Sequence, residues 1–200
     1  MITTLEELRA LYALPKERAV KKQLDYLDPH CIRFISLSPF LVIASASRAG
    51  MPDASPRGGE PGFVHVLDER TLLLPDAKGN NRLDTLMNII ETGRVGLIFL
   101  IPGIDETLRV NGDAALGDEP EMIGRFADRA NPPKLVVRIT VREAYLHCAK
   151  AFMRSKLWNP DRRVERSVLP PMGKMINDQI GASGPIETQE EMRARYLKDL

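Results

Sequence analysis

The feature that most constrains the fold is a series of short apolar runs, each of strand length, separated by turn-forming residues. The runs are rich in β-branched and other apolar side chains, and glycine, proline and acidic residues interrupt them. They occupy residues 40–46, 53–56, 63–67, 71–74, 95–101, 108–116 and 135–145. Successive short strands at this spacing predict an antiparallel barrel or sandwich.

Helical patterns flank these strands. Near the start, Thr4 and Glu7 have the spacing of a capping box, and an apolar stripe from Leu5 to Tyr12 follows. Further helices are expected over residues 15–25, 30–37, 118–129 and 147–158, and from Thr188 onward. We interpret the N-terminal helices as cover for the barrel and for a partner subunit. The fold class is therefore mainly β with helices (α+β).

The composition predicts one ordinary globular domain. The 200 residues carry a net charge of +1 with basic residues spread throughout, so no nucleic-acid partner is indicated. We divide residues 1–200 into a helical extension (1–37), a barrel core (38–158) and a tail (159–200). Neither a signal peptide nor a membrane span is expected, because no apolar run approaches roughly 18 residues.

The two cysteines, Cys31 and Cys148, are far apart and form no C-x-x-C pair, so neither a disulfide framework nor a metal site is expected. A reducing cytoplasm fits this usage. No glycine-rich Rossmann or Walker loop and no G-x-S-x-G elbow occurs, and no spacing singles out a catalytic residue.

The loop after the fourth run has the features of a phosphate site. Pro75 ends an apolar run, and the polar residues that follow favour turns. From Leu83 the apolar residues have helical spacing, with Asn81 expected as the N-cap. A helix start attracts anions, and Lys78 and Arg82 would add charge. The alternative is an ordinary capped surface helix.

An upstream segment strengthens the phosphate interpretation. Ser55, Arg57 and two glycines lie in a strand-like stretch, where glycine often marks the close approach of a ligand. The alternative is that Arg57 is a surface residue and that Gly58 and Gly59 only form a bulge.

At this point the sequence resembles the pyridoxamine 5'-phosphate oxidase-like FMN-binding split barrels, and more narrowly a subgroup with the motifs SPRGG, GNNRLD and ETLRVNG. Seven matching segments lie in order at residues 55–59, 61–64, 73–76, 79–84, 101–103, 106–112 and 147–158. Each is weak alone, but their order makes a chance match improbable.

The resemblance implies a split Greek-key barrel with added helices and a homodimer that binds FMN at its subunit interface. The residues that it implies near FMN come from two subunits. The first subunit would supply Ser55, Arg57 and Gly58 beside the cofactor, Pro75 and Asp76 beside the ring or ribityl chain, and Asn80, Asn81 and Arg82 at the phosphate. The second would supply Arg109, Asn111, Lys150, Arg154, Ser155 and Trp158. For Lys150, Arg154, Ser155 and Trp158, simple packing and solvation are an equal alternative.

The sequence departs from true pyridoxamine phosphate oxidases near its end, where it lacks their substrate-holding tryptophan and arginine-leucine motif. We therefore expect an FMN-dependent oxidoreductase that acts on another, unassigned small molecule. The alternatives are a flavin carrier or sensor without turnover, and a family member that binds F420 or haem.

Overall fold

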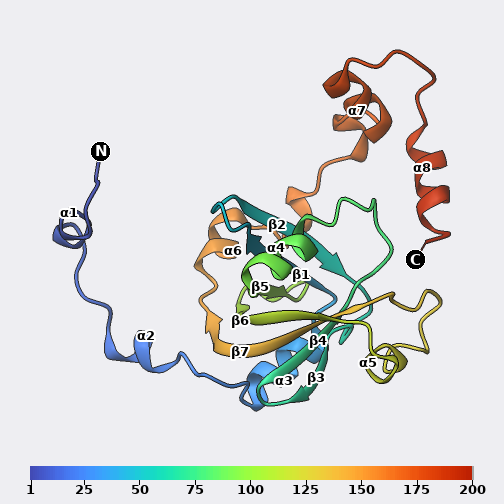
Figure 1. Cartoon of the computed structure of the whole chain (residues 1–200). Coiled ribbons are helices and arrows are strands. Elements are labelled where there is room, and N and C mark those ends of the chain that lie inside the picture. Colours follow the sequence, from blue (N-terminus) through green and yellow to red (C-terminus); the bar gives the residue numbers. More distant parts are fainter. Residues whose placement is uncertain (200) are drawn as a thin grey trace.

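Seven strands pair into one antiparallel sheet in the computed structural model of the protein, which describes residues 1–199 (Figure 1). The strands are β1 (Phe40–Ala46), β2 (Pro52–Gly58), β3 (His65–Asp68), β4 (Thr71–Pro75), β5 (Arg94–Leu100), β6 (Thr107–Gly117) and β7 (Val136–His147). Their order in the sheet is β2-β1-β5-β6-β7-β4-β3. The seven runs predicted from the sequence thus correspond to the seven strands.

The sheet has one face that forms the core. Along β1, Leu41 and Ile43 are fully buried, whereas Val42 and Ala44 point to the other face. Residues directly opposite each other in antiparallel strands share a face, so the partners of Ile43, which are Ser55 on β2 and Leu97 on β5, lie on the core side. We call the opposite side the outer face.

Two helices complete the core. Helix α3 (Pro29–Leu37) contacts β3, β6 and β7, and α4 (Asp84–Thr92) contacts β1, β2, β5 and β6. Ile35 of α3 and Ile89 of α4 belong to the same apolar cluster as the core side of the sheet. Burying apolar surface at about 25 cal/mol per Å² makes this cluster the main source of stability.

The sheet curls, although its two edge strands do not pair with each other. β2 is the first strand in the order and β4 the sixth, yet the charge of Arg57 on β2 acts on the carboxyl of Asp76, which directly follows β4, and partly opposes the rise in the Asp76 pKa that burial causes. The two ends of the sheet therefore approach each other without closing. This arrangement confirms the predicted split barrel with added helices.

Both ends of the chain form arms that extend away from the sheet (Figure 1). The N-terminal arm (residues 1–21) carries α1 (Leu5–Ala10) and α2 (Glu17–Lys21), and neither helix has a buried residue. The C-terminal arm (residues 159–199) carries α7 (Met172–Ile180) and α8 (Gln189–Tyr196), again without a buried residue. We call residues 22–158 the body.

The prediction that the N-terminal helices cover the barrel is correct for α3 and wrong for α1 and α2. The capping boxes at Thr4 and Thr188 are both present, so the local signals are confirmed. These local signals predict that the arm helices form, but not whether the helices contact the body.

Several element boundaries also differ from the predictions. α5 (Pro120–Gly124) and α6 (Lys150–Ser155) are shorter than expected. Asn81 is not the N-cap of α4, because the helix begins at Asp84 and Leu83 holds the cap position in a left-handed conformation (φ 61°). Asn81 itself has a positive φ of 62°, so the loop turns twice before the helix starts.

None of the helices in residues 1–199 combines the length and the hydropathy that a bilayer crossing requires.

Candidate functional site

Strand β2 is the element around which the predicted site residues gather. It lies at one edge of the sheet, paired only with β1, and its side chains alternate between half-buried and exposed. Ser55 and Arg57 are half-buried on the core side, opposite Ile43 and Leu41. An edge strand with polar residues facing inward leaves them accessible from the open side of the curled sheet.

Arg57 and Asp76 lie close enough for the charge of Arg57 to act on the Asp76 carboxyl. Burial raises the pKa of the Asp76 carboxyl, and the positive charge of Arg57 partly opposes that rise. Arg57 also donates a hydrogen bond of 2.9 Å to the carbonyl of Pro56. Pro75, which precedes Asp76, is buried as the last residue of β4. The structure thus brings together Arg57 and Asp76, which are distant in the sequence.

The loop between β4 and α4 carries Asn80, Asn81 and Arg82, and all three are exposed. The side-chain oxygen of Asn80 accepts a hydrogen bond of 3.1 Å from the backbone N–H of Arg82. The guanidinium of Arg82 forms an ion pair of 2.8 Å with Asp84 in the first turn of α4. The hydrogen bond with Asp84 and its charge raise the pKa of Arg82, and the charge of Asp53 on β2 adds a smaller contribution.

Lys78, which the sequence places in the same loop, pairs with Asp199 at 2.5 Å. The tip of the C-terminal arm therefore contacts the loop. Both partners are exposed, and exposed ion pairs contribute only about 0 to 1 kcal/mol.

A largely buried polar network, which sequence reasoning missed, fixes α4 against β1 and β2. Thr85 donates a hydrogen bond of 2.7 Å to the carboxylate of Asp53. Asn88 donates one of 3.0 Å to the hydroxyl of Ser45, which in turn contacts Asp53 at 3.4 Å. We call these four residues the α4 anchor. Their signal in the sequence is weak: Thr85 and Asn88 are polar residues three apart on the apolar side of a helix.

Arg109 and Asn111 lie on β6 on the outer face, opposite to Ser55 and Arg57. Their side chains, with Val42 and Ala44 of β1, line a shallow hollow of about 120 Å³. Asn111 donates a hydrogen bond of 2.7 Å to Glu143, and the guanidinium of Arg109 lies 5.3 Å from the ring centre of Tyr145.

The hollow depends on a glycine. A Cβ on Gly96 would lie 2.9 Å from the side-chain oxygen of Asn111, closer than real Cβ atoms approach. Glycine at this position therefore lets the Asn111 amide lie across β5.

The last group of predicted residues lies on and after α6. The indole N–H of Trp158 donates a hydrogen bond of 2.9 Å to the carbonyl of Ile104, and its ring stacks on Phe152. The Ser155 hydroxyl bonds to the carbonyl of Phe152. Lys150 and Arg154 are exposed, and no ion pair of either occurs within residues 1–199.

The predicted residues therefore form three groups in one chain. Around β2 lie Ser55, Arg57, Gly58, Pro75, Asp76, Asn80, Asn81 and Arg82. Arg109 and Asn111 lie on the other face of the sheet, and the α6 residues lie beyond the end of β7. The described part of the chain contains no cluster of His, Cys, Asp or Glu that could hold a metal ion.

Comparison with known protein families identifies the family to which this chain belongs. The sequence model of the pyridoxamine 5'-phosphate oxidase family matches residues 27–148, which is more than half of the chain and includes every strand. The chain therefore belongs to the pyridoxamine 5'-phosphate oxidase family. The comparison with curated proteins found no match to this sequence.

Solved structures share the fold at low sequence identity. A variant of HupZ from Group A Streptococcus has 18% identity and a TM-score of 0.51, with 60% of this chain and 99% of that chain covered. A candidate pyridoxamine 5'-phosphate oxidase from Lactobacillus delbrueckii has 20% identity and a TM-score of 0.50, with 62% and 98% covered. At this level of identity the similarity establishes the fold alone.

Proposed function

We propose that this protein is an FMN-binding flavoprotein and an oxidoreductase that acts on a small molecule. The observation that carries the proposal is the position of Arg57 and of the loop with Arg82, which both lie beside the open edge strand β2 of a chain in this family. One guanidinium on the edge strand and another on the loop before α4 suit the phosphate of FMN, because arginine binds phosphate through paired, charge-assisted hydrogen bonds.

Binding of the phosphate at Arg82 requires an exchange of partners. Arg82 is paired with Asp84, but both side chains are largely exposed, so little free energy is lost when the pair opens. The phosphate would then take the place of the carboxylate beside the first turn of α4. We expect Asn80 and Asn81 to shape the loop around it, and Ser55 and Gly58 to line its β2 side.

The dimer is the second part of the proposal. The outer hollow of about 120 Å³ is well below the roughly 300 to 1,000 Å³ of small-molecule pockets, so Arg109 and Asn111 cannot enclose a cofactor with their own chain alone. In the homodimer we propose, these residues and Lys150, Arg154, Ser155 and Trp158 complete the site on the partner chain. FMN at such an interface would stabilise the dimer by mass action.

When bound, the flavin supplies the redox chemistry, and the protein supplies binding and orientation. In this proposal Arg57 and Arg82 hold the phosphate, and Asp76 hydrogen-bonds the ring or the ribityl chain. Because burial raises the pKa of Asp76, this carboxyl is easier to protonate than an exposed one and can then also donate a hydrogen bond.

We further propose that pyridoxamine 5'-phosphate is not the substrate. The family match ends at residue 148, and the segment after it lacks the substrate-holding motif of the true oxidases. A site that has lost its polar partners for a substrate discriminates against it by several powers of ten.

Two unpaired cysteines, Cys31 and Cys148, are in keeping with a location in the reducing cytoplasm.

The test begins with the absorbance spectrum of the purified protein and the mass of the molecule released on denaturation. FMN supports the proposal, whereas F420 or haem overturns it. The FMN-loaded protein is then mixed with a reduced nicotinamide dinucleotide as hydride donor and, separately, with pyridoxamine 5'-phosphate under air. Fast reduction by the first identifies an enzyme, and a flavin that no reductant reaches identifies a carrier. Turnover of the second at roughly 1 per second or faster overturns the substrate proposal.

A further inference from the structure

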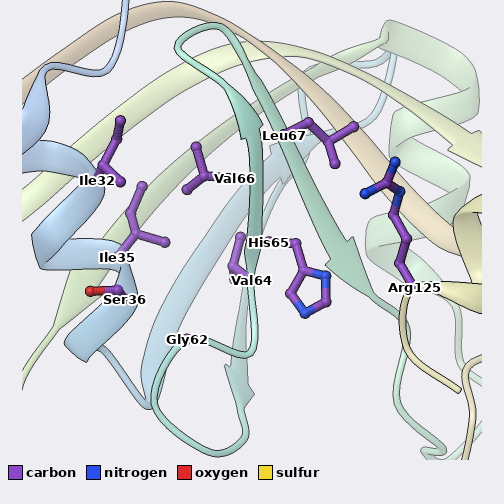
Figure 2. A pocket seen from close by; sticks show the side chains of 9 residues that line it. All are labelled: Ile32, Ile35, Ser36, Gly62, Val64, His65, Val66, Leu67 and Arg125. Atoms are coloured by element: carbon purple, nitrogen blue, oxygen red, sulfur yellow. The ribbon is translucent and has the colours of Figure 1, made fainter. Parts of the chain in front are cut away.

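A second cavity lies on the opposite edge of the sheet and shares no residue with the candidate cofactor site. Its volume is about 320 Å³, and it extends along the edge strand β3 between α3 and the segment after α5 (Figure 2). Because successive side chains of a strand point to opposite sides, the two sides of this cavity differ in chemistry. It is large enough to reach the lower end of the range of small-molecule pockets.

One side of the cavity is apolar. Ile32 and Ile35 of α3 face Val64 and Val66, which point toward the helix from the β3 segment (Figure 2). Ile35 and Val64 are buried in the core, whereas Ile32 is partly exposed at the rim. This side can therefore hold an apolar group against a rigid wall.

The other side carries a positive charge. His65 and Leu67 point away from α3, toward the guanidinium of Arg125 (Figure 2). Arg125 is exposed, and no ion pair of this side chain occurs within residues 1–199. The charged groups that act on His65 are Arg129, Asp128 and Arg125, so arginines outnumber carboxylates here by two to one.

The position of Arg125 is fixed by its neighbours. The next residue, Phe126, is fully buried, and its ring stacks on His65 with a centroid distance of 4.2 Å. Arg129 lies 5.1 Å from the same ring and donates a hydrogen bond of 3.0 Å to the carbonyl of Phe63. Arg129 is thus held by the Phe63 carbonyl, whereas the guanidinium of Arg125 lies at the rim and has no ion-pair partner among residues 1–199.

We propose that this cavity, the β3 cavity, binds a small carboxylic acid with an apolar body. The apolar body lies against Ile32 and Val66 at the edge of β3, and the carboxylate reaches over that edge to pair with Arg125. An added peptide strand fits less well, because β3 has four residues and its pairing with β4 shifts register at Val66, and both features disfavour further pairing. The proposal does not depend on the identity of the cofactor.

The test uses two probes of the same shape, phenylpropionate and the uncharged phenylpropanol. Each is titrated into the full-length protein with its cofactor bound and with isotope-labelled isoleucine methyl groups, observed by NMR. Signals of Ile32 and Ile35 are expected to shift, while Ile98 on the outer face of β5 stays unchanged. The acid is expected to bind about tenfold more tightly than the alcohol, because only the carboxylate of the acid forms an ion-paired hydrogen bond with Arg125.

Two variants locate the charge. Arg125→Gln is expected to reduce the affinity for phenylpropionate about tenfold, to that of the alcohol. Arg94→Gln removes an exposed arginine on β5 and is expected to change nothing. Three results overturn the proposal: no shift of Ile32 and Ile35 up to about 10 mM acid, equal affinity for both probes, or an unchanged affinity in Arg125→Gln while Ile32 and Ile35 keep their wild-type signals without probe.

Discussion

The body and the N-terminal arm use the same kind of residue in opposite ways. Leu97 of β5 is 1% exposed, whereas Leu5 of α1 is 80% exposed. Both leucines belong to regular apolar patterns, one with the period of a strand and one with the period of a helix. The difference shows that a pattern specifies an element and its apolar side, but not the surface that will cover that side.

The arm helices are too short to be stable alone. α1 has six residues and α2 has five, and isolated helices below about 12 residues are marginal in water even with good caps. The capping box of α1 satisfies its backbone groups without burying a side chain. We therefore expect the apolar stripe of this arm to be covered in the proposed dimer.

The largest effect is expected from the core. Leu97→Ala should lower the free energy of unfolding by about 2 to 5 kcal/mol, because it removes a fully buried side chain and leaves a cavity. Chemical denaturation of the apoprotein measures this change.

The same substitution in the arm sharpens the comparison. Leu5→Ala should change the free energy of unfolding of the body by less than about 0.5 kcal/mol. Sedimentation would show weaker dimerisation if the partner covers the arm. An equal loss of stability in both variants would contradict the distinction between body and arm.

A smaller effect is expected from the α4 anchor. Thr85→Val removes the hydroxyl that donates to Asp53 and should cost about 1 to 3 kcal/mol, because a half-buried carboxylate loses a partner. Thr3→Val, at an exposed position of the arm, is the matched control and should be neutral. The FMN affinity should fall in Thr85→Val alone, since the anchor holds α4 and its loop beside β2. A drop in stability without any change in FMN affinity would show that the α4 anchor stabilises the fold but does not contribute to FMN binding.

The fold was largely predictable from the sequence, because each strand of the body has the apolar pattern of a strand and is bounded by turn-forming residues. For the site, the sequence predicted which types of residue take part but not how they are arranged in space. Spacing could not show that Arg57 approaches Asp76, since that contact depends on the curl of the whole sheet. Nor could it show the left-handed conformation of Leu83, which moves the start of α4 away from Asn81.

The smallest effect concerns Asp76. Its pKa in the folded protein is raised by burial, so the stability linked to its protonated form is complete below the pKa of the unfolded chain and is lost as the pH rises through the folded pKa. Asp76→Asn should therefore make the apoprotein more stable at pH 7, by less than about 1 kcal/mol because the carboxyl is only half-buried. This advantage should vanish in acid. Denaturation curves across the pH range measure it, and a variant that is less stable at neutral pH would refute the role of burial.

The central claim is that the edge of β2 binds the phosphate of a flavin, and paired titrations of the apoprotein with FMN and riboflavin test it most directly. With Arg57 and Arg82 on the phosphate, FMN should bind at least about tenfold more tightly, since each charge-assisted hydrogen bond contributes on the order of 1.5 to 3 kcal/mol. Arg82→Ala should weaken FMN and leave riboflavin almost unchanged, whereas Arg94→Ala on β5 should affect neither. Equal affinities for FMN and riboflavin in the unmodified protein would contradict the account.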